Sequence, residues 1–94
     1  MKYYVIAGEP SGDLHGANLI KGLKKADPSA EFRFWGGDRM VEAAGATNLV
    51  RHYRQTSFFG IAQVLRNLRT ILGQVALCKR DIEAWQPDVV ILID

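Results

Sequence analysis

The stretch that decides the fold of this chain is residues 2–13, KYYVIAGEPSGD. Its first six residues form a nearly continuous apolar run that Gly8 ends, which is typical of a strand covered on both faces in a parallel sheet. The following residues have turn chemistry, because Gly8 and Gly12 reach backbone angles that other residues avoid and Pro10 favours an extended residue before it. The stretch therefore predicts a strand followed by a shaped loop at residues 8–13.

A helix is expected directly after this loop. Ser11 or Asp13 is suited to cap it, since both side chains accept hydrogen bonds from the first free amides of a helix. Apolar positions then recur at helical spacing at Gly16, Leu19, Ile20 and Leu23. Pro28 is expected to close the helix.

A second strand and a short helix come next. Residues 31–35, EFRFW, alternate between polar and aromatic side chains and meet a Gly-Gly turn at residues 36–37. Asp38 is expected to cap a helix over residues 39–44, and Gly45 is well placed to terminate it.

The second half of the chain predicts one more helical region between two strands. A small strand is expected at residues 49–53, and residues 58–84 predict one helix, or two separated near Gly73. Pro87 closes the helical region. Residues 88–94, DVVILID, are an uninterrupted apolar run between two carboxylates, which is typical of a central parallel strand.

This alternation of strands and helices predicts an α/β domain with a Rossmann-like parallel sheet, flanking helices and right-handed crossovers. Such folds place ligands at the carboxyl ends of their strands, and further strands are expected to complete the sheet after residue 94. We therefore expect residues 1–94 to be an incomplete N-terminal domain.

Composition and charge narrow the class of protein. The chain has 94 residues, of which 48% are hydrophobic and 23% charged, and these shares favour a globular domain over a disordered one. A net charge of +2 is too small to indicate a nucleic-acid partner. The single cysteine, Cys78, excludes an intrachain disulfide and fits a reducing compartment, and His15 and His52 lack the spacing of a metal site. No apolar stretch approaches the roughly 20 residues that span a bilayer, so a cytoplasmic location is expected.

The glycine-bearing loop is the first candidate site. It lacks the Gly-Lys-Ser/Thr of a P-loop and the tighter glycine spacing of a dinucleotide fingerprint. A strand-to-helix connection with no ligand is an equal alternative, although the start of a helix favours an anion. Glu9 changes this balance, because its carboxylate is better suited to accept hydrogen bonds from sugar hydroxyls than to hold a pyrophosphate.

The long helical region carries a wide apolar stripe with basic flanks. No Asp or Glu occurs between residues 43 and 80, whereas Arg66 and Arg69 flank the stripe. A core helix with a basic solvent face is one interpretation, and a helix on an anionic membrane surface is the other. On the second interpretation, the membrane-contacting residues are Phe58, Phe59, Ile61, Val64, Leu65, Leu68 and Leu72.

Four segments together resemble one enzyme family. AGEPSGDLHGANL at residues 7–19, GGDRMVEAAG, SFFGIAQVLRNL and PDVVILID are similar, in order and approximate spacing, to motifs of lipid-A-disaccharide synthases. The resemblance implies a GT-B glycosyltransferase, in which two Rossmann-like domains face each other across a cleft. It also implies that the donor nucleotide is held mainly by a C-terminal domain absent from these 94 residues, with no metal or other cofactor.

The resemblance further implies a reaction and its residues. The reaction transfers 2,3-diacylglucosamine from UDP to 2,3-diacylglucosamine 1-phosphate, on the inner face of the cytoplasmic membrane. On the residues alone, a cap of the next turn or a solvated strand end is the favoured interpretation of Asp94. The resemblance reverses this preference, because Asp94 matches the family's functionally important aspartate and would be the general base. The acceptor would be bound by Gly8, Glu9, Ser11, Gly12 and Asp13.

Two other functions remain open for the sequence. The domain could be a different Rossmann-type enzyme that binds a nucleotide through its glycine loop, or a noncatalytic module that docks on membranes through its basic helix. The preferred function requires that the loop at residues 8–13 and Asp94 meet at the same edge of the sheet.

Overall fold

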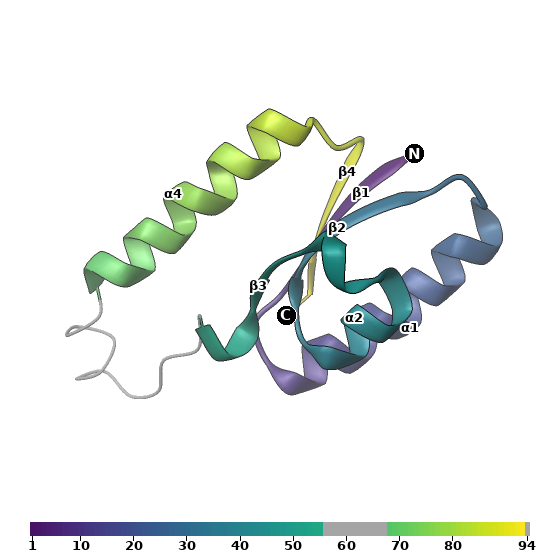
Figure 1. Cartoon of the computed structure of the whole chain (residues 1–94), viewed down its shortest axis with the longest axis horizontal. Coiled ribbons are helices and arrows are strands. Elements are labelled where there is room, and N and C mark those ends of the chain that lie inside the picture. Colours follow the sequence, from purple (N-terminus) through teal and green to yellow (C-terminus); the bar gives the residue numbers. More distant parts are fainter. Residues whose placement is uncertain (56–67, 94) are drawn as a thin grey trace.

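The computed structural model describes residues 1–55 and 68–93, which form a four-stranded sheet with helices on both faces (Figure 1). Two groups of predicted residues lie outside this part of the chain. One is the predicted base, Asp94. The other is the first part of the predicted membrane stripe, namely Phe58, Phe59, Ile61, Val64 and Leu65.

The elements follow the predicted alternation of strands and helices. In chain order they are β1 (Lys2–Ala7), α1 (Pro10–Ala26), β2 (Glu31–Gly36), α2 (Asp38–Ala44), β3 (Leu49–His52), α4 (Leu68–Trp85) and β4 (Val89–Ile93), with short 3-10 turns at Ala46–Asn48 and Tyr53–Gln55. Gly45 ends α2 at φ 100°, a left-handed conformation that glycine adopts without strain, as predicted.

Two local predictions were wrong. α1 begins at Pro10 with Glu9 as its N-cap, so neither Ser11 nor Asp13 caps it; the fixed φ of proline suits the first helical position and moves the start of the helix forward. The N-cap of α2 is Gly37 rather than Asp38, which lies inside the helix. Of the two alternatives left open near Gly73, α4 follows the continuous one, since one glycine costs a helix only about 1 kcal/mol.

All described strands are parallel, and their order is β3-β2-β1-β4. The predicted Rossmann-like α/β class is confirmed. From β1 the chain adds β2 and β3 on one side and then β4 on the other, which makes the β1–β4 boundary the switch point where such folds bind ligands. At that boundary Ala7 pairs with Ile93.

The sequence predicted a central position for β4, but among the described strands it lies at an edge. Val90 and Leu92, on the sheet face opposite the core, are 44% and 74% exposed. The apolar run identified the strand correctly, whereas strand order depends on the crossovers and is not written in such a run.

The sheet face under α1 and α2 holds the hydrophobic core. Its buried members are Tyr3, Val5, Ala7, Ala17, Ile20, Phe32, Phe34, Met40 and Ala43. Gly16 lets α1 approach α2, because a Cβ at this position would lie 2.7 Å from Met40 Sδ. Complete burial of side chains such as Phe34 and Ile20 contributes about 1.5–3 kcal/mol each.

Among the described elements, α4 alone lies over the opposite face, and it leans away from the sheet toward its N-terminal end (Figure 1). None of its residues is buried. The described contacts lie near its C-terminal end: Asp81 accepts hydrogen bonds from Tyr4 Oη at 2.8 Å and from Arg33 Nε and Nη2 at 2.6 Å each. Trp35 Nε1 donates to Tyr4 Oη at 2.7 Å and extends this polar cluster into the sheet.

Candidate functional site

The turn after β1 lies at the switch point of the sheet. Gly8, Glu9 and Ser11 are all exposed there. Glu9 has extended backbone angles, φ −153° and ψ 166°, as the following proline predicts. Ser11 Oγ donates to Glu9 Oε1 at 3.0 Å, which holds the carboxylate in place while leaving it open to solvent. The turn therefore presents a fixed carboxylate at the carboxyl edge of the sheet.

Gly12 lies directly beneath this turn and is buried. A Cβ at Gly12 would lie 3.3 Å from Ala7 Cβ and 3.6 Å from Ile93 Cγ2. Glycine thus allows the first turn of α1 to rest on the ends of β1 and β4. Its part in the site is to bring the turn and the strand ends together.

Asp13 is buried, at 4% exposure, and its carboxylate caps α2 from the neighbouring helix. Oδ1 accepts hydrogen bonds from the amides of Gly37 at 2.8 Å and Met40 at 3.0 Å, and Oδ2 accepts one from the amide of Arg39 at 3.0 Å. The first amides of a helix have no partner within it, so this carboxylate satisfies groups that α2 cannot satisfy itself.

Sequence reasoning missed this contact between the two helices, although a signal existed. Asp13 falls on the same helical face as Gly16, Ala17 and Ile20, and all four are buried. A carboxylate on a buried face needs several hydrogen-bond donors, and the uncapped Gly-Gly turn at residues 36–37 could supply them.

The end of β3 is tied to the start of α2. His52 Nε2 lies 3.1 Å from Asp38 Oδ1, and the amide of Arg54 donates to His52 Nδ1 at 3.2 Å. Since Nδ1 accepts, the hydrogen-bond pattern assigns the ring proton to Nε2. Tyr53 packs on Gly37, where a Cβ would lie 2.3 Å from Tyr53 Cε2. These contacts hold the turn at residues 37–39, between β2 and α2, at the carboxyl edge of the sheet.

The predicted site residues thus fall into three groups. Gly8, Glu9 and Ser11 are exposed at the edge, whereas Gly12 and Asp13 are buried beneath them. Asp94 lies outside the described residues, and its place beside the turn stays a prediction; Ile93, which precedes it, pairs with Ala7 at that edge.

Comparison with known proteins gives a family. Residues 3–94 match the family described as Lipid-A-disaccharide synthetase. The chain belongs to this family. The resemblance of its motifs is confirmed over nearly the whole chain.

Three relatives named lipid-A-disaccharide synthase illustrate the similarity to this family. The protein of Chromohalobacter salexigens is 44% identical over 94 residues, which are 100% of this chain and 24% of that protein. Those of Geobacter metallireducens and Coxiella burnetii are 40% and 37% identical over 90 residues, 96% of this chain and 23% of each relative. The chain thus spans about a quarter of the length of these synthases. No solved structure matches it.

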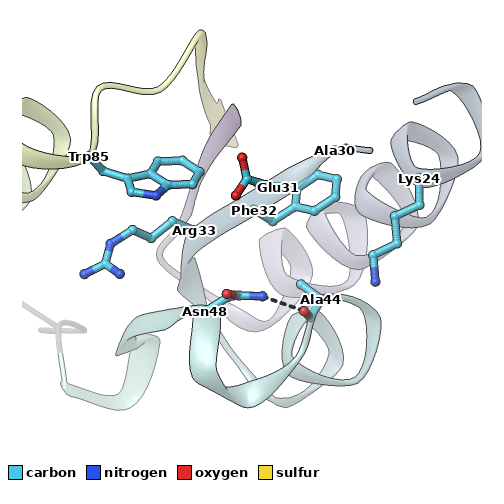
Figure 2. A pocket seen from close by; sticks show the side chains of 8 residues that line it. All are labelled: Lys24, Ala30, Glu31, Phe32, Arg33, Ala44, Asn48 and Trp85. Atoms are coloured by element: carbon cyan, nitrogen blue, oxygen red, sulfur yellow. Dashed lines mark hydrogen bonds between the residues drawn. The ribbon is translucent and has the colours of Figure 1, made fainter. Parts of the chain in front are cut away.

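Two hollows lie away from the candidate site. A pocket of about 330 Å³ opens beside the amino-terminal half of β2 (Figure 2), lined by Lys24, Ala30, Glu31, Phe32, Arg33, Ala44, Asn48 and Trp85. An apolar groove of about 430 Å³ runs along α4 between Val75 and Glu83. Neither of these two is lined by a residue of the turn after β1. Within residues 1–55 and 68–93, no cluster of three or more His, Cys, Asp or Glu could hold a metal.

Three titratable groups with shifted pKa values lie on the α4 face of the sheet. The hydrogen bond from Arg33 lowers the pKa of Asp81, and burial raises the pKa of Tyr4 above its usual value. Burial also raises the pKa of the Cys78 thiol, which therefore stays protonated and poorly nucleophilic at neutral pH. These shifts belong to the polar cluster around Asp81.

Proposed function

We propose that this chain forms the acceptor side of a lipid-A-disaccharide synthase. The reaction transfers 2,3-diacylglucosamine from UDP to 2,3-diacylglucosamine 1-phosphate and yields the β-linked disaccharide 1-phosphate and UDP. The observation that carries the proposal is the exposed Glu9 carboxylate, held by Ser11 at the switch point of a Rossmann-like sheet in a chain of this family. The names of the relatives support the reaction.

The chemistry requires one proton acceptor and one group that orients the acceptor sugar. An acceptor hydroxyl attacks the anomeric carbon, the bond from that carbon to the UDP oxygen breaks, and its electron pair leaves with UDP. We assign the hydroxyl proton to Asp94 as general base, because this residue directly follows Ile93 at the β1–β4 boundary. Gly8, Glu9 and Ser11 would contact sugar hydroxyls, while Gly12 and Asp13 complete the site from beneath.

The donor belongs to a second Rossmann-like domain in this proposal. Glycosyl transfer between two sugars needs a site for each, and the turn after β1 supplies one of them. The greater length of the relatives, of which this chain covers about a quarter, is consistent with a further domain that holds UDP.

A chimera tests the proposal. Residues 1–94 replace the matching quarter of the Chromohalobacter salexigens synthase, and disaccharide formation is measured with both sugar substrates. We expect an active chimera in which Asp94→Asn lowers kcat by about 10²-fold or more. Glu9→Gln should mainly raise KM for the acceptor. Asp27→Asn, at the far end of α1, is the matched control and should change neither constant. Near-normal turnover of the Asp94→Asn chimera would exclude the base role.

We also propose that α4 contacts an anionic membrane surface, on the inner face of the cytoplasmic membrane. The observation in favour is an exposed apolar stripe: Leu68, Leu72 and Val75 are 48%, 59% and 62% exposed. Basic residues such as Arg69 lie beside it, and a basic amphipathic helix of this kind suits an anionic interface. Among the described helices, none is long and apolar enough to cross a bilayer.

Flotation with phosphatidylglycerol vesicles tests the membrane contact. The double substitution Leu68→Ser and Leu72→Ser should abolish flotation of the chain, because it removes apolar surface from the stripe. Leu14→Ser is the control, since Leu14 is also exposed, at 41%, but lies on α1 across the sheet. Equal flotation of the original chain, the double variant and Leu14→Ser would reject the proposal that α4 contacts the membrane.

A further inference from the structure

We infer that Asp13 is a positioning residue for the acceptor, and that the acceptor site has two walls. One wall is the turn at residues 8–11, and the other is the turn at residues 37–39, which the Asp13 carboxylate holds in place. The inference rests on the proposed function and deepens it, because it changes the role of a residue predicted to touch the substrate.

The carboxylate of Asp13 is fully engaged by protein amides. Three backbone N–H groups reach it at 2.8–3.0 Å, two at Oδ1 and one at Oδ2. Its residue is 4% exposed. A buried carboxylate at the N-terminus of a helix is stabilised by these donors and by the helix dipole. If the carboxylate turned toward a sugar instead, several amides would lose their hydrogen-bond partner. Asp13 therefore acts on the substrate through the turn that it binds.

The geometry connects this carboxylate to both walls. Asp13 lies two residues after Ser11, in the first turn of α1, which rests on the strand ends through Gly12. The second turn follows β2, the neighbour of β1 in the sheet. A displacement of α1 at Asp13 would therefore move the two walls relative to each other.

Gly37 shows how tightly the second wall is held. A Cβ at this residue would lie 2.7 Å from Asp13 Oδ2 on one side and 2.3 Å from Tyr53 Cε2 on the other. A side chain at this position would therefore collide with both groups. The His52 contact with Asp38 at 3.1 Å adds a tie immediately beyond Gly37.

The second wall adds a cation to the carboxyl edge. Arg39 donates its amide to Asp13, while its side chain is exposed. The proposed acceptor carries a phosphate, and a guanidinium is well suited to bind one through paired hydrogen bonds. Acceptor affinity should therefore depend on where Asp13 holds this turn.

The chimera described above tests the inference by steady-state kinetics in each substrate. Asp13→Asn keeps the shape of the side chain but replaces one acceptor oxygen with an NH₂ group, which cannot accept a hydrogen bond from the Arg39 amide. We expect KM for the acceptor to rise about tenfold, as for the loss of one buried hydrogen bond, while kcat and KM for the donor change less than about twofold. Asp27→Asn is the matched control with the same change of charge.

Gly37→Ala gives an independent arm, since it displaces the second wall without altering any charge. It should also raise KM for the acceptor, and the double variant Asp13→Asn, Gly37→Ala should show less than the sum of the two free-energy effects, because both act on one turn. Circular dichroism confirms folding of each chimera.

Three results would overturn the inference. They are an unchanged acceptor KM in either folded variant, additive effects in the double variant, and a loss of kcat in Asp13→Asn with an unchanged acceptor KM, which would indicate a direct catalytic role. An inactive unmodified chimera would instead overturn the proposed function together with this inference.

Discussion

The two faces of the sheet are held by different forces. Under α1 and α2, nine buried side chains form one apolar cluster. Under α4, no helix residue is buried, and hydrogen bonds to Asp81 connect the helix to Tyr4 and Arg33. The first face is therefore held by apolar packing, whereas the second combines the buried rings of Tyr4 and Trp35 with hydrogen bonds that connect α4 to the sheet.

The difference matters because the two forces respond to different conditions. Apolar burial is non-directional and roughly proportional to area, so it tolerates changes of pH and depends on volume. A charge-assisted cluster is directional and depends on the ionisation of its members. The effects of substitutions on the free energy of unfolding should accordingly differ between the two faces, both in size and in pH dependence.

The largest effect is expected from Phe34→Ala on the buried face. Phe34 is 0% exposed, and its truncation should lower the free energy of unfolding of the chain by about 3–5 kcal/mol. Chemical denaturation followed by circular dichroism measures the change. Leu92→Ala, at a residue that is 74% exposed, is the control and should cost far less. Equal losses in the two variants would mean that the buried face does not dominate stability.

An intermediate effect, dependent on pH, is expected from Asp81→Asn on the α4 face. The substitution should cost about 1 kcal/mol at neutral pH, since Arg33 is 35% exposed and water screens part of the interaction. The hydrogen bond from Arg33 lowers the pKa of Asp81, so its stabilisation is present above the unfolded pKa of about 4 and is lost as the pH falls through the folded pKa.

Denaturation at several pH values between about 7 and 2 measures this difference between the original chain and Asp81→Asn. This difference in the free energy of unfolding should become smaller as the pH falls. Glu83→Gln, which removes an exposed carboxylate two residues further along α4, should show no such narrowing. A gap that stays constant with pH would show that Asp81 contributes through shape rather than through charge.

The smallest effect on stability is expected from Leu72→Ser. Leu72 is 59% exposed on α4, and surface substitutions of this kind usually change the free energy of unfolding by less than about 0.5 kcal/mol. Thermal unfolding of the chain and of the variant checks this. A fall of more than about 1 kcal/mol in the free energy of unfolding would mean that Leu72 is packed in an interface, and that the α4 face contributes more to stability than we expect.

The sequence predicted most elements because their signals are local. The apolar run before Gly8, the aromatic alternation of β2 and the run at β4 each identify a strand without reference to the rest of the chain. The exposed turn with Glu9 was also predicted, since glycine and proline there leave few alternatives.

The features that the sequence did not predict depend on partners distant in the chain. The amides that Asp13 binds lie 24 to 27 residues away, and only the packing of α1 on α2 brings them together. The cluster at Asp81 likewise joins residues up to 77 positions apart. The order of the strands follows from the crossovers, which a strand's own residues do not encode.

The described contacts of α4 with the sheet lie near its C-terminal end, so a small rotation there moves the other end of the helix much further. From Asp81 to Leu68 the helix extends about 20 Å, given a rise of about 1.5 Å per residue. A rotation of about 10° at the polar cluster would carry Leu68 through about 3 Å, which is enough to re-aim the whole apolar stripe. Among the described residues, the direction of the apolar stripe therefore depends on the contacts that Asp81 and Trp85 make with β1 and β2.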